Sequence, residues 1–163
     1  MKSAIIYHSR YGNVSNVANE LGVILKKFGG VELLEVHYAN KPSTRHSLLS
    51  RIFPKLLKIV PIKTDLSEYD VVFFGISVSS KSAMTPILQY LEMASNILKK
   101  KIICIYVYAI ESRARKCSYQ INDILAKKGQ KPLADIFIPW GNIQDVDYMQ
   151  GVFNQILAAL NIH

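Results

Sequence analysis

The sequence has little cysteine and no long hydrophobic run. It contains two cysteines, too few for a disulfide framework: Cys104 lies inside an apolar run and Cys117 in a polar stretch. We therefore expect both to be reduced thiols. No window approaches the roughly 18 uninterrupted apolar residues that a membrane span needs, and the first residues form no charged-then-apolar leader. These absences predict a cytoplasmic protein.

Acidic residues are the minority among the charged residues. The chain has 12 Asp and Glu against 20 Lys and Arg, which gives a formal charge of +8 at pH 7 and an isoelectric point near 9.5. Such a charge favours an acidic protein, nucleic acid or anionic lipid as a partner. Nucleic acid is the least favoured, because there is no nucleic-acid motif and no interleaving of basic and aromatic residues.

Patterns for metal binding and for phosphoacceptor chemistry are also missing. His37, His46 and His163 are scattered and form no ligand spacing with either cysteine or with a carboxylate pair. We predict no metal. The first predicted strand ends without an acidic pair, and Ser77 stands where a response regulator needs a phosphoacceptor aspartate. That class of protein is excluded.

Short apolar runs indicate the strands. The 163 residues, half of them hydrophobic, predict one domain over residues 1–163. Runs rich in β-branched and aromatic residues are typical of strands buried on both faces, as in parallel sheets. Five are present, the second being the weakest: residues 4–7, 31–36, 71–75, 102–108 and 136–139.

Segments with the apolar periodicity of a helix lie between these runs. One apolar stripe spans residues 14–28 and stops at two glycines, and another, residues 87–98, follows Pro86. Further stripes occupy residues 121–125 and 149–160. Because strand and helix alternate, the crossovers are right-handed and helices cover both faces of the sheet. The predicted fold is α/β, a three-layer doubly wound sandwich around a five-stranded parallel sheet.

Residues 40–64 depart from this scheme. They include Lys41, Arg45, Arg51, Lys55, Lys58 and Lys63 and no acidic residue. An apolar stripe from Leu48 to Val60, interrupted at Pro54, predicts a basic amphipathic helix. This helix is either the second crossover helix with its lysines in water, or a docking face for an acidic partner or a membrane surface.

The turn after the first strand has the properties of an anion site. Residues 9–14, SRYGNV, lead directly from the strand into a helix. Backbone N–H groups at a helix N-terminus are free to bind an anion, and in open α/β sheets ligands bind at this edge. No Gly-Lys-Ser/Thr closes the loop, so it is not a Walker A motif, and its lone glycine excludes a dinucleotide fingerprint. We predict a phosphate site.

Residues 5–13 resemble the phosphate loop of the flavodoxin family, whose pattern is Thr/Ser-x-Thr-Gly-x-Thr after a strand opening with Met-Lys and apolar residues. Residues 69–75 resemble that family's third strand, and residues 84–87 the segment after its second flavin loop. The order of elements agrees over essentially the whole chain. The resemblance implies strand order 2-1-3-4-5 and non-covalent FMN. It also implies electron transfer, or hydride transfer as in related quinone reductases and the quinone-dependent protoporphyrinogen oxidase type.

The resemblance also implies the cofactor-binding residues. The FMN phosphate is assigned to Ser9, Arg10, Tyr11, Gly12, Asn13 and Val14, one side of the isoalloxazine to Ser77, Val78, Ser79, Ser80 and Lys81, and the other side to Tyr108, Ala109, Ile110, Glu111 and Ser112. No catalytic acid or base is required, because the cofactor carries the chemistry.

Three features depart from the family pattern. The third loop, residues 109–112, lacks the glycine and the acidic or aromatic pattern common in the family. Tyr11 and Val14 replace threonines, so Ser9, Ser15, Arg10 and backbone amides remain as phosphate donors. The second loop offers no aromatic ring to stack on the flavin, a loss of about tenfold in affinity. Binding survives such a loss. The alternative is a flavin-free module that uses the basic segment 40–64 to hold an acidic protein, nucleic acid or a membrane.

Several other residues have two interpretations each. Cys117, close to Arg113, Arg115 and Lys116, is either a thiol with a lowered pKa or an exposed spectator. The same basic cluster would draw an acidic redox partner toward the flavin edge. His8 is a ligand-facing residue or a packed one, and Trp140 is interpreted as a packing residue.

Overall fold

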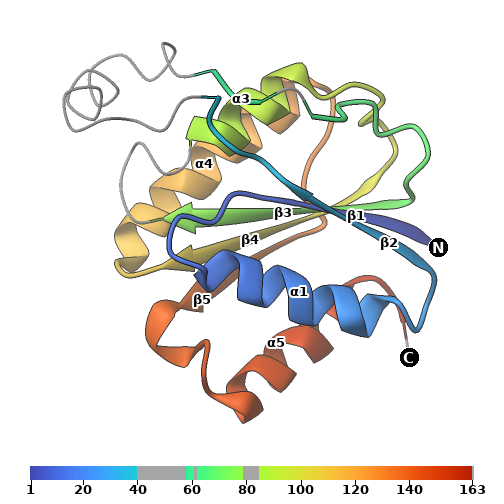
Figure 1. The fold of residues 1–163 in the computed structure, drawn as a ribbon. Helices are drawn as coiled ribbons and strands as arrows, with labels where there is room; N and C mark the ends of the chain where they lie inside the picture. The colour runs from blue at the N-terminus through green and yellow to red at the C-terminus, as the bar shows by residue number, and fades with distance from the viewer. Residues whose placement is uncertain (40–57, 61, 79–84, 163) are drawn as a thin grey trace.

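The computed structural model describes residues 1–39, 58–60, 62–78 and 85–162 (Figure 1). Their strands form one parallel sheet whose order is β2-β1-β3-β4-β5. Both the fold class and the strand order are confirmed. The strands are β1 (Lys2–Tyr7), β2 (Gly30–Glu35), β3 (Val71–Val78), β4 (Lys101–Tyr108) and β5 (Ala134–Pro139).

Helices cover the two faces of the sheet (Figure 1). One face carries α1 (Asn13–Leu25) and α5 (Val146–Ala159), and the other carries α3 (Thr85–Met93) and α4 (Glu111–Lys127). A 3₁₀ turn, η2 (Trp140–Asn142), connects β5 to α5. None of the helices in the described part of the chain is both long and apolar enough to span a bilayer.

The central strand β3 shows why its apolar run is uninterrupted. All eight of its residues are buried. Successive side chains point to opposite faces, so Val72 and Phe74 join the core beneath α3 and α4, and Val71 and Phe73 join the core beneath α1 and α5. A strand covered on both faces therefore has no place for the polar half of an alternating pattern.

Several predicted boundaries were wrong. α1 ends at Leu25 and does not include Phe28, and α4 begins at Glu111, well before the predicted stripe of residues 121–125. β3 continues three residues beyond Gly75, to Val78, because each of these residues pairs with β4. The helix α3 ends at Met93 and does not reach Leu98. There the chain leaves the helix to pair with the segment before β3: the Ser95 N–H donates to the Thr64 carbonyl at 2.9 Å, and Asn96 has a φ of 54°.

Most of the basic segment, residues 40–57 and 61, lies outside the described residues, and so does most of its predicted helix. Its end is not helical: Ile59 forms an antiparallel bridge with Tyr38, and the Val60 N–H donates to the His37 carbonyl at 2.8 Å. The prediction of a helical stripe that includes Val60 was wrong at this end. Lys63 is part of a local cluster, since its ammonium group pairs with Glu32 and Glu68.

Candidate functional site

The site is built at the carboxyl edge of the sheet, where the direction of winding reverses. β1 has β2 on one side and β3 on the other, so the connections after β1 and β3 diverge to opposite faces. Tyr7 pairs with Gly75, and Val78 pairs with Tyr108. The ends of β1, β3 and β4 therefore bring the first and third predicted segments, and the start of the second, to one edge (Figure 1).

Gly12 shapes the first loop. It is the N-cap residue of α1, with φ 84° and ψ −23°, a left-handed conformation that favours glycine. A Cβ built at Gly12 would meet nothing within 4 Å. The residue is thus required for its backbone conformation and not for lack of space around it.

The first turn of α1 presents backbone donors. The Ser15 N–H donates to Ser9 Oγ at 3.2 Å, and Ser15 Oγ donates to the Gly12 carbonyl at 2.7 Å. No acceptor in the described part of the chain bonds the N–H groups of Asn13 and Val14. Because the first N–H groups of a helix have no partner within it, these two remain available to an anion.

Gly75, in the middle of β3, holds this turn close to the sheet. A Cβ at Gly75 would lie 2.8 Å from Tyr7 Cβ and 2.9 Å from Val14 Cγ1. The side chain of Val14 is buried against this glycine, so Val14 can offer a ligand only its backbone. Sequence reasoning missed Gly75, although a glycine inside an apolar strand is a signal of close approach.

Aromatic and basic side chains border the loop. Tyr11 is 61% exposed and makes an edge contact with Trp140, with 6.3 Å between ring centroids. The Arg10 guanidinium lies 5.3 Å from the centre of the Tyr11 ring. Trp140 therefore packs, as predicted, but its neighbour is the loop itself. Its buried indole N–H has no hydrogen-bond partner among the described residues.

His8 is a packed residue. Its Nδ1 lies 2.8 Å from the Val36 carbonyl oxygen, which can only accept, so Nδ1 carries the proton. Its ring contacts Tyr38 edge-on at 5.5 Å. Burial is the main cause of a lowered His8 pKa. His8 thus ties the start of the loop to the segment that follows β2.

The second and third predicted segments are described in part. Ser77 and Val78 are buried at the end of β3, while Ser79, Ser80 and Lys81 lie outside the described residues. In the third segment Tyr108 is half-buried, and Ala109, Ile110, Glu111 and Ser112 are exposed. The Glu111 carboxylate pairs with Arg115 of its own helix at 3.0 Å.

The prediction for Cys117 was wrong. Its side chain is buried beneath α4, so it is neither an exposed spectator nor a thiol activated by the neighbouring cations. Burial, with a smaller effect from the Asp135 carboxylate, raises the pKa of Cys117 to about 12. The side chains of Arg113, Arg115 and Lys116 are exposed, and the Arg115 guanidinium lies over the Phe137 ring of β5, 4.4 Å from its centre.

Both thiols are therefore expected to be unreactive in the folded protein. Cys104 is fully buried, and desolvation raises its pKa as well. We expect a disulfide reagent at pH 8 to modify less than about a tenth of the thiols in the time that modifies all of them in urea. Rapid modification of Cys117 without denaturant would contradict its burial.

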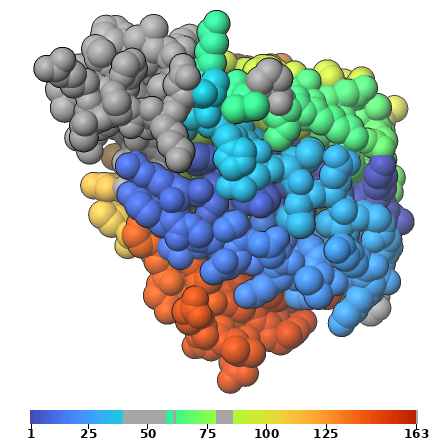
Figure 2. All heavy atoms as spheres, in the orientation of Figure 1, coloured from blue at the N-terminus to red at the C-terminus, as the bar shows by residue number. Residues whose placement is uncertain are grey.

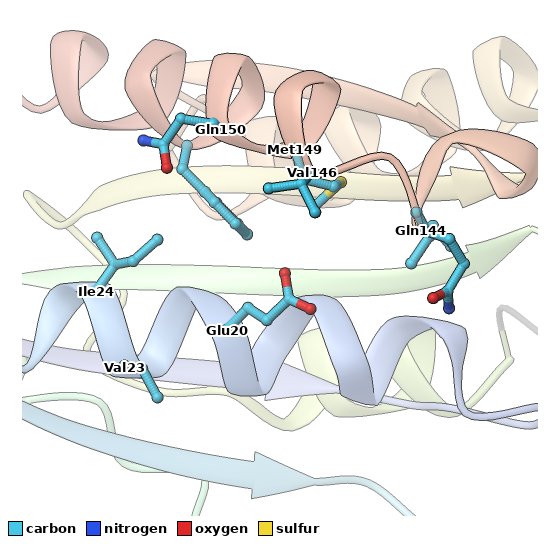
Figure 3. A pocket seen from close by; sticks show the side chains of 9 residues that line it. Glu20, Val23, Ile24, Gln144, Val146, Met149 and Gln150 are labelled. Atoms are coloured by element: carbon cyan, nitrogen blue, oxygen red, sulfur yellow. The ribbon is translucent and has the colours of Figure 1, made fainter.

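An open groove lies apart from this edge, between α1 and α5, which adjoin across one face of the molecule (Figure 2). In Figure 3 the carboxylate of Glu20 extends from α1 toward α5, opposite Val146 and Met149. The groove contains none of the predicted cofactor-binding residues. Among the described residues, no three His, Cys, Asp or Glu side chains gather as a metal site.

Solved structures share this architecture over nearly the whole chain. Oxidised flavodoxin 1 from Bacillus cereus gives a TM-score of 0.69 at 11% identity, over 99% of this chain and 98% of that one. The chain has the flavodoxin-like fold. Flavodoxin 2 from Bacillus cereus gives 0.64 at 18% identity over 99% of each chain. An NADPH-quinone reductase from P. pentosaceus gives 0.63 at 12% identity over 100% of each chain.

The similarity is one of structure. No protein-family model matches the sequence, and no curated protein matches it. The flavodoxin-like fold accounts for the strand order, for the reversal of winding between β1 and β3, and for the position of the Gly12 loop at that reversal. What the loop binds has to be argued from its own groups.

Proposed function

We propose that this protein binds FMN at the carboxyl edge of the sheet and acts in electron transfer or as a small flavin-dependent oxidoreductase. The observation that carries the proposal is the first turn of α1, where the N–H groups of Asn13 and Val14 follow the left-handed Gly12. A flavodoxin-like fold with such a turn at the reversal point supports a flavin phosphate as the anion.

The residues present fit a phosphate group. Two amide donors and the positive end of the α1 dipole favour a dianion, and Arg10 adds a charge at the rim. Ser9 Oγ is already an acceptor for the Ser15 N–H, which leaves its hydroxyl hydrogen free to donate to a phosphate oxygen. The buried side chain of Val14 anchors the turn, and no acceptor among the described residues bonds its amide.

The adjoining strand ends suit a flat, partly apolar group. Tyr108 is half-buried at the end of β4, and Ile110 next to it is 45% exposed. Val78 ends the neighbouring strand. These side chains would contact the ring system, and when bound FMN would supply the redox chemistry. The role of the protein is to hold the group and limit its contact with water.

The redox partner is expected to be acidic. The net charge is +8, and Arg113 and Lys116 are exposed on the first half of α4, immediately after the third segment. Opposite charges on the two proteins would raise their association rate, with a strong dependence on salt.

Titration with FMN tests the proposal. Trp140 is the chain's only tryptophan and contacts Tyr11 of the loop, so its fluorescence reports on loop occupancy. We expect saturable quenching at one FMN per chain. Riboflavin, which lacks the phosphate, is expected to bind at least about tenfold more weakly, because it forgoes charge-assisted hydrogen bonds. If FMN neither co-purifies with the protein nor quenches Trp140, the proposal of FMN binding fails. The alternative is then the flavin-free module that uses residues 40–64 to hold a partner.

A further inference from the structure

The amino edge of the sheet, opposite the candidate site, carries a lysine-rich surface. Residues 98–101, LKKK, lead into β4, and residues 128–133, KGQKPL, lead from α4 to β5. These two segments, called here the amino-edge surface, contain five lysines and no acidic residue: Lys99, Lys100, Lys101, Lys128 and Lys131. They lie where the strands begin, at the end away from the arrowheads in Figure 1.

Hydrogen bonds join the two segments into one surface. The side-chain amide of Gln130 donates to the carbonyls of Ile97 at 3.1 Å and Lys100 at 2.9 Å. The ammonium group of Lys128 donates to the carbonyls of Glu92 at 3.1 Å and Ala94 at 2.9 Å. The lysines of the two segments are therefore held on a common, ordered part of the fold.

Exposed aliphatic side chains accompany the lysines. Leu98 is 58% exposed and Leu133 is 49% exposed, and Met93, at the end of α3, is 53% exposed. Leu98 packs over Gly129, where a Cβ would come within 3.2 Å of its Cδ2. The surface thus combines positive charge with apolar groups that face water in the isolated protein.

Two of the lysines are available to a partner. Lys100, Lys101 and Lys128 donate to backbone carbonyls. Lys99 and Lys131 are exposed, and no acceptor among the described residues bonds their ammonium groups. Three acids lie nearby. Asp123 is paired with Lys127 at 2.6 Å, and Glu92 is exposed at the border. Asp70 lines a hollow together with Lys99, Lys100 and Lys101, and its carboxylate accepts from the backbone N–H of Lys2 at 2.7 Å.

We propose that the amino-edge surface docks this protein on an anionic lipid membrane. Lysines next to a negatively charged leaflet are attracted by it, and exposed leucines gain by entering the boundary between headgroups and acyl chains. A nucleic acid fits less well. The surface contains neither arginine, which grips phosphate bidentately, nor an aromatic ring on which a base would stack.

The proposal is independent of flavin binding and has a geometric consequence. Because the amino and carboxyl edges are opposite ends of the sheet, a chain docked this way turns the Gly12 loop away from the lipid. The candidate site would then remain open to a partner in solution.

Sedimentation of the full chain with vesicles tests the docking. Vesicles of equal parts phosphatidylglycerol and phosphatidylcholine are expected to bind it, and phosphatidylcholine vesicles are not. The double variant Lys99→Gln, Lys131→Gln is expected to lower the partition coefficient about 25-fold, or about fivefold per lysine from about 1 kcal/mol each. Leu98→Ser with Leu133→Ser is expected to weaken binding to the same vesicles at roughly 0.15 M salt, where the charge attraction is screened.

The matched control removes two positive charges near the carboxyl edge of the sheet, away from the amino-edge surface. Lys58, which belongs to the basic segment 40–64, and Lys116 are exposed near the carboxyl edge. If the amino-edge surface and not the basic segment docks the protein, Lys58→Gln with Lys116→Gln changes the partition by less than about threefold. An equal loss in both pairs would show attraction by net charge alone and overturn the proposal. So would an absence of binding to anionic vesicles at low salt, or an oligonucleotide that displaces the vesicles through Lys99 and Lys131. No acceptor within residues 1–39, 58–60, 62–78 and 85–162 bonds the ammonium groups of either pair, and circular dichroism verifies that the variants fold.

Discussion

Replacing Gly12 by alanine is expected to weaken FMN binding by about fivefold to thirtyfold, or to destabilise the flavin-free protein by about 1–2 kcal/mol. The reason is its φ of 84°, a conformation that costs an L-residue about this much free energy. If the loop keeps its shape, the strain lowers the free energy of unfolding. If the loop relaxes to another shape, the amides of Asn13 and Val14 turn away from the phosphate, and the affinity for FMN falls instead.

Flavin titration and urea unfolding of the same variant separate these two outcomes. Gly151→Ala is the matched control, because Gly151 also has no atom within 4 Å of its Cβ position but lies exposed in α5. There alanine favours the helix, so a gain of about 0.5–1 kcal/mol is expected with no change in FMN affinity. Unchanged stability and unchanged affinity in Gly12→Ala would contradict the strained-loop account.

Replacing Gly75 by alanine is expected to destabilise the fold by about 1–3 kcal/mol and to displace the first turn of α1. The new Cβ would lie 2.8 Å from Tyr7 Cβ and 2.9 Å from Val14 Cγ1, and such overpacking forces the neighbours apart. Tyr7 Cβ is part of β1 and has little freedom to move. Most of the shift would therefore fall on Val14 and the amides of the first turn of α1, and the affinity for FMN is expected to fall at least about tenfold if these amides hold its phosphate.

A double-mutant cycle with Val14→Ala tests this contact. Removing Val14 Cγ1 opens space on one side, so the double variant is expected to lose less stability than the sum of the single losses, by at least about 0.5 kcal/mol. Gly22→Ala is the control, since its nearest neighbour, Leu33, would lie at an ordinary 3.6 Å. Additive losses in the cycle would show that Gly75 and Val14 are not in close contact.

The apolar pattern was enough to predict the sheet. Strands buried on both faces need uninterrupted hydrophobic runs, and helices that cover a sheet need a stripe, so the element order could be read directly. Boundaries were less predictable. The apolar residues Ala94 and Leu98 continue the stripe of α3, but backbone pairing of Ser95 with Thr64 ends the helix first.

The candidate site, too, could be predicted from the sequence only in part. The turn at residues 9–14, for which an anion site stays a prediction, could be placed from the sequence because it is a local connection between a strand and a helix, with a glycine before the helix. The importance of Gly75 was not, since it arises from contact with Val14, which is distant in the chain. The pairing of Tyr11 with Trp140 also depends on segments that only folding brings together.

Charge patterns proved the weakest guide to burial and chemistry. Three cations near Cys117 suggested an activated thiol, yet the three cations are exposed while the sulfur is buried, and desolvation raises its pKa. The sequence by itself determined the order of strands and helices along the chain and the position of the turn between β1 and α1, because both depend on local periodicity. Tertiary structure decided which side chains support that turn, which thiols are accessible and which lysines share a surface, because those properties depend on contacts between residues far apart in the chain.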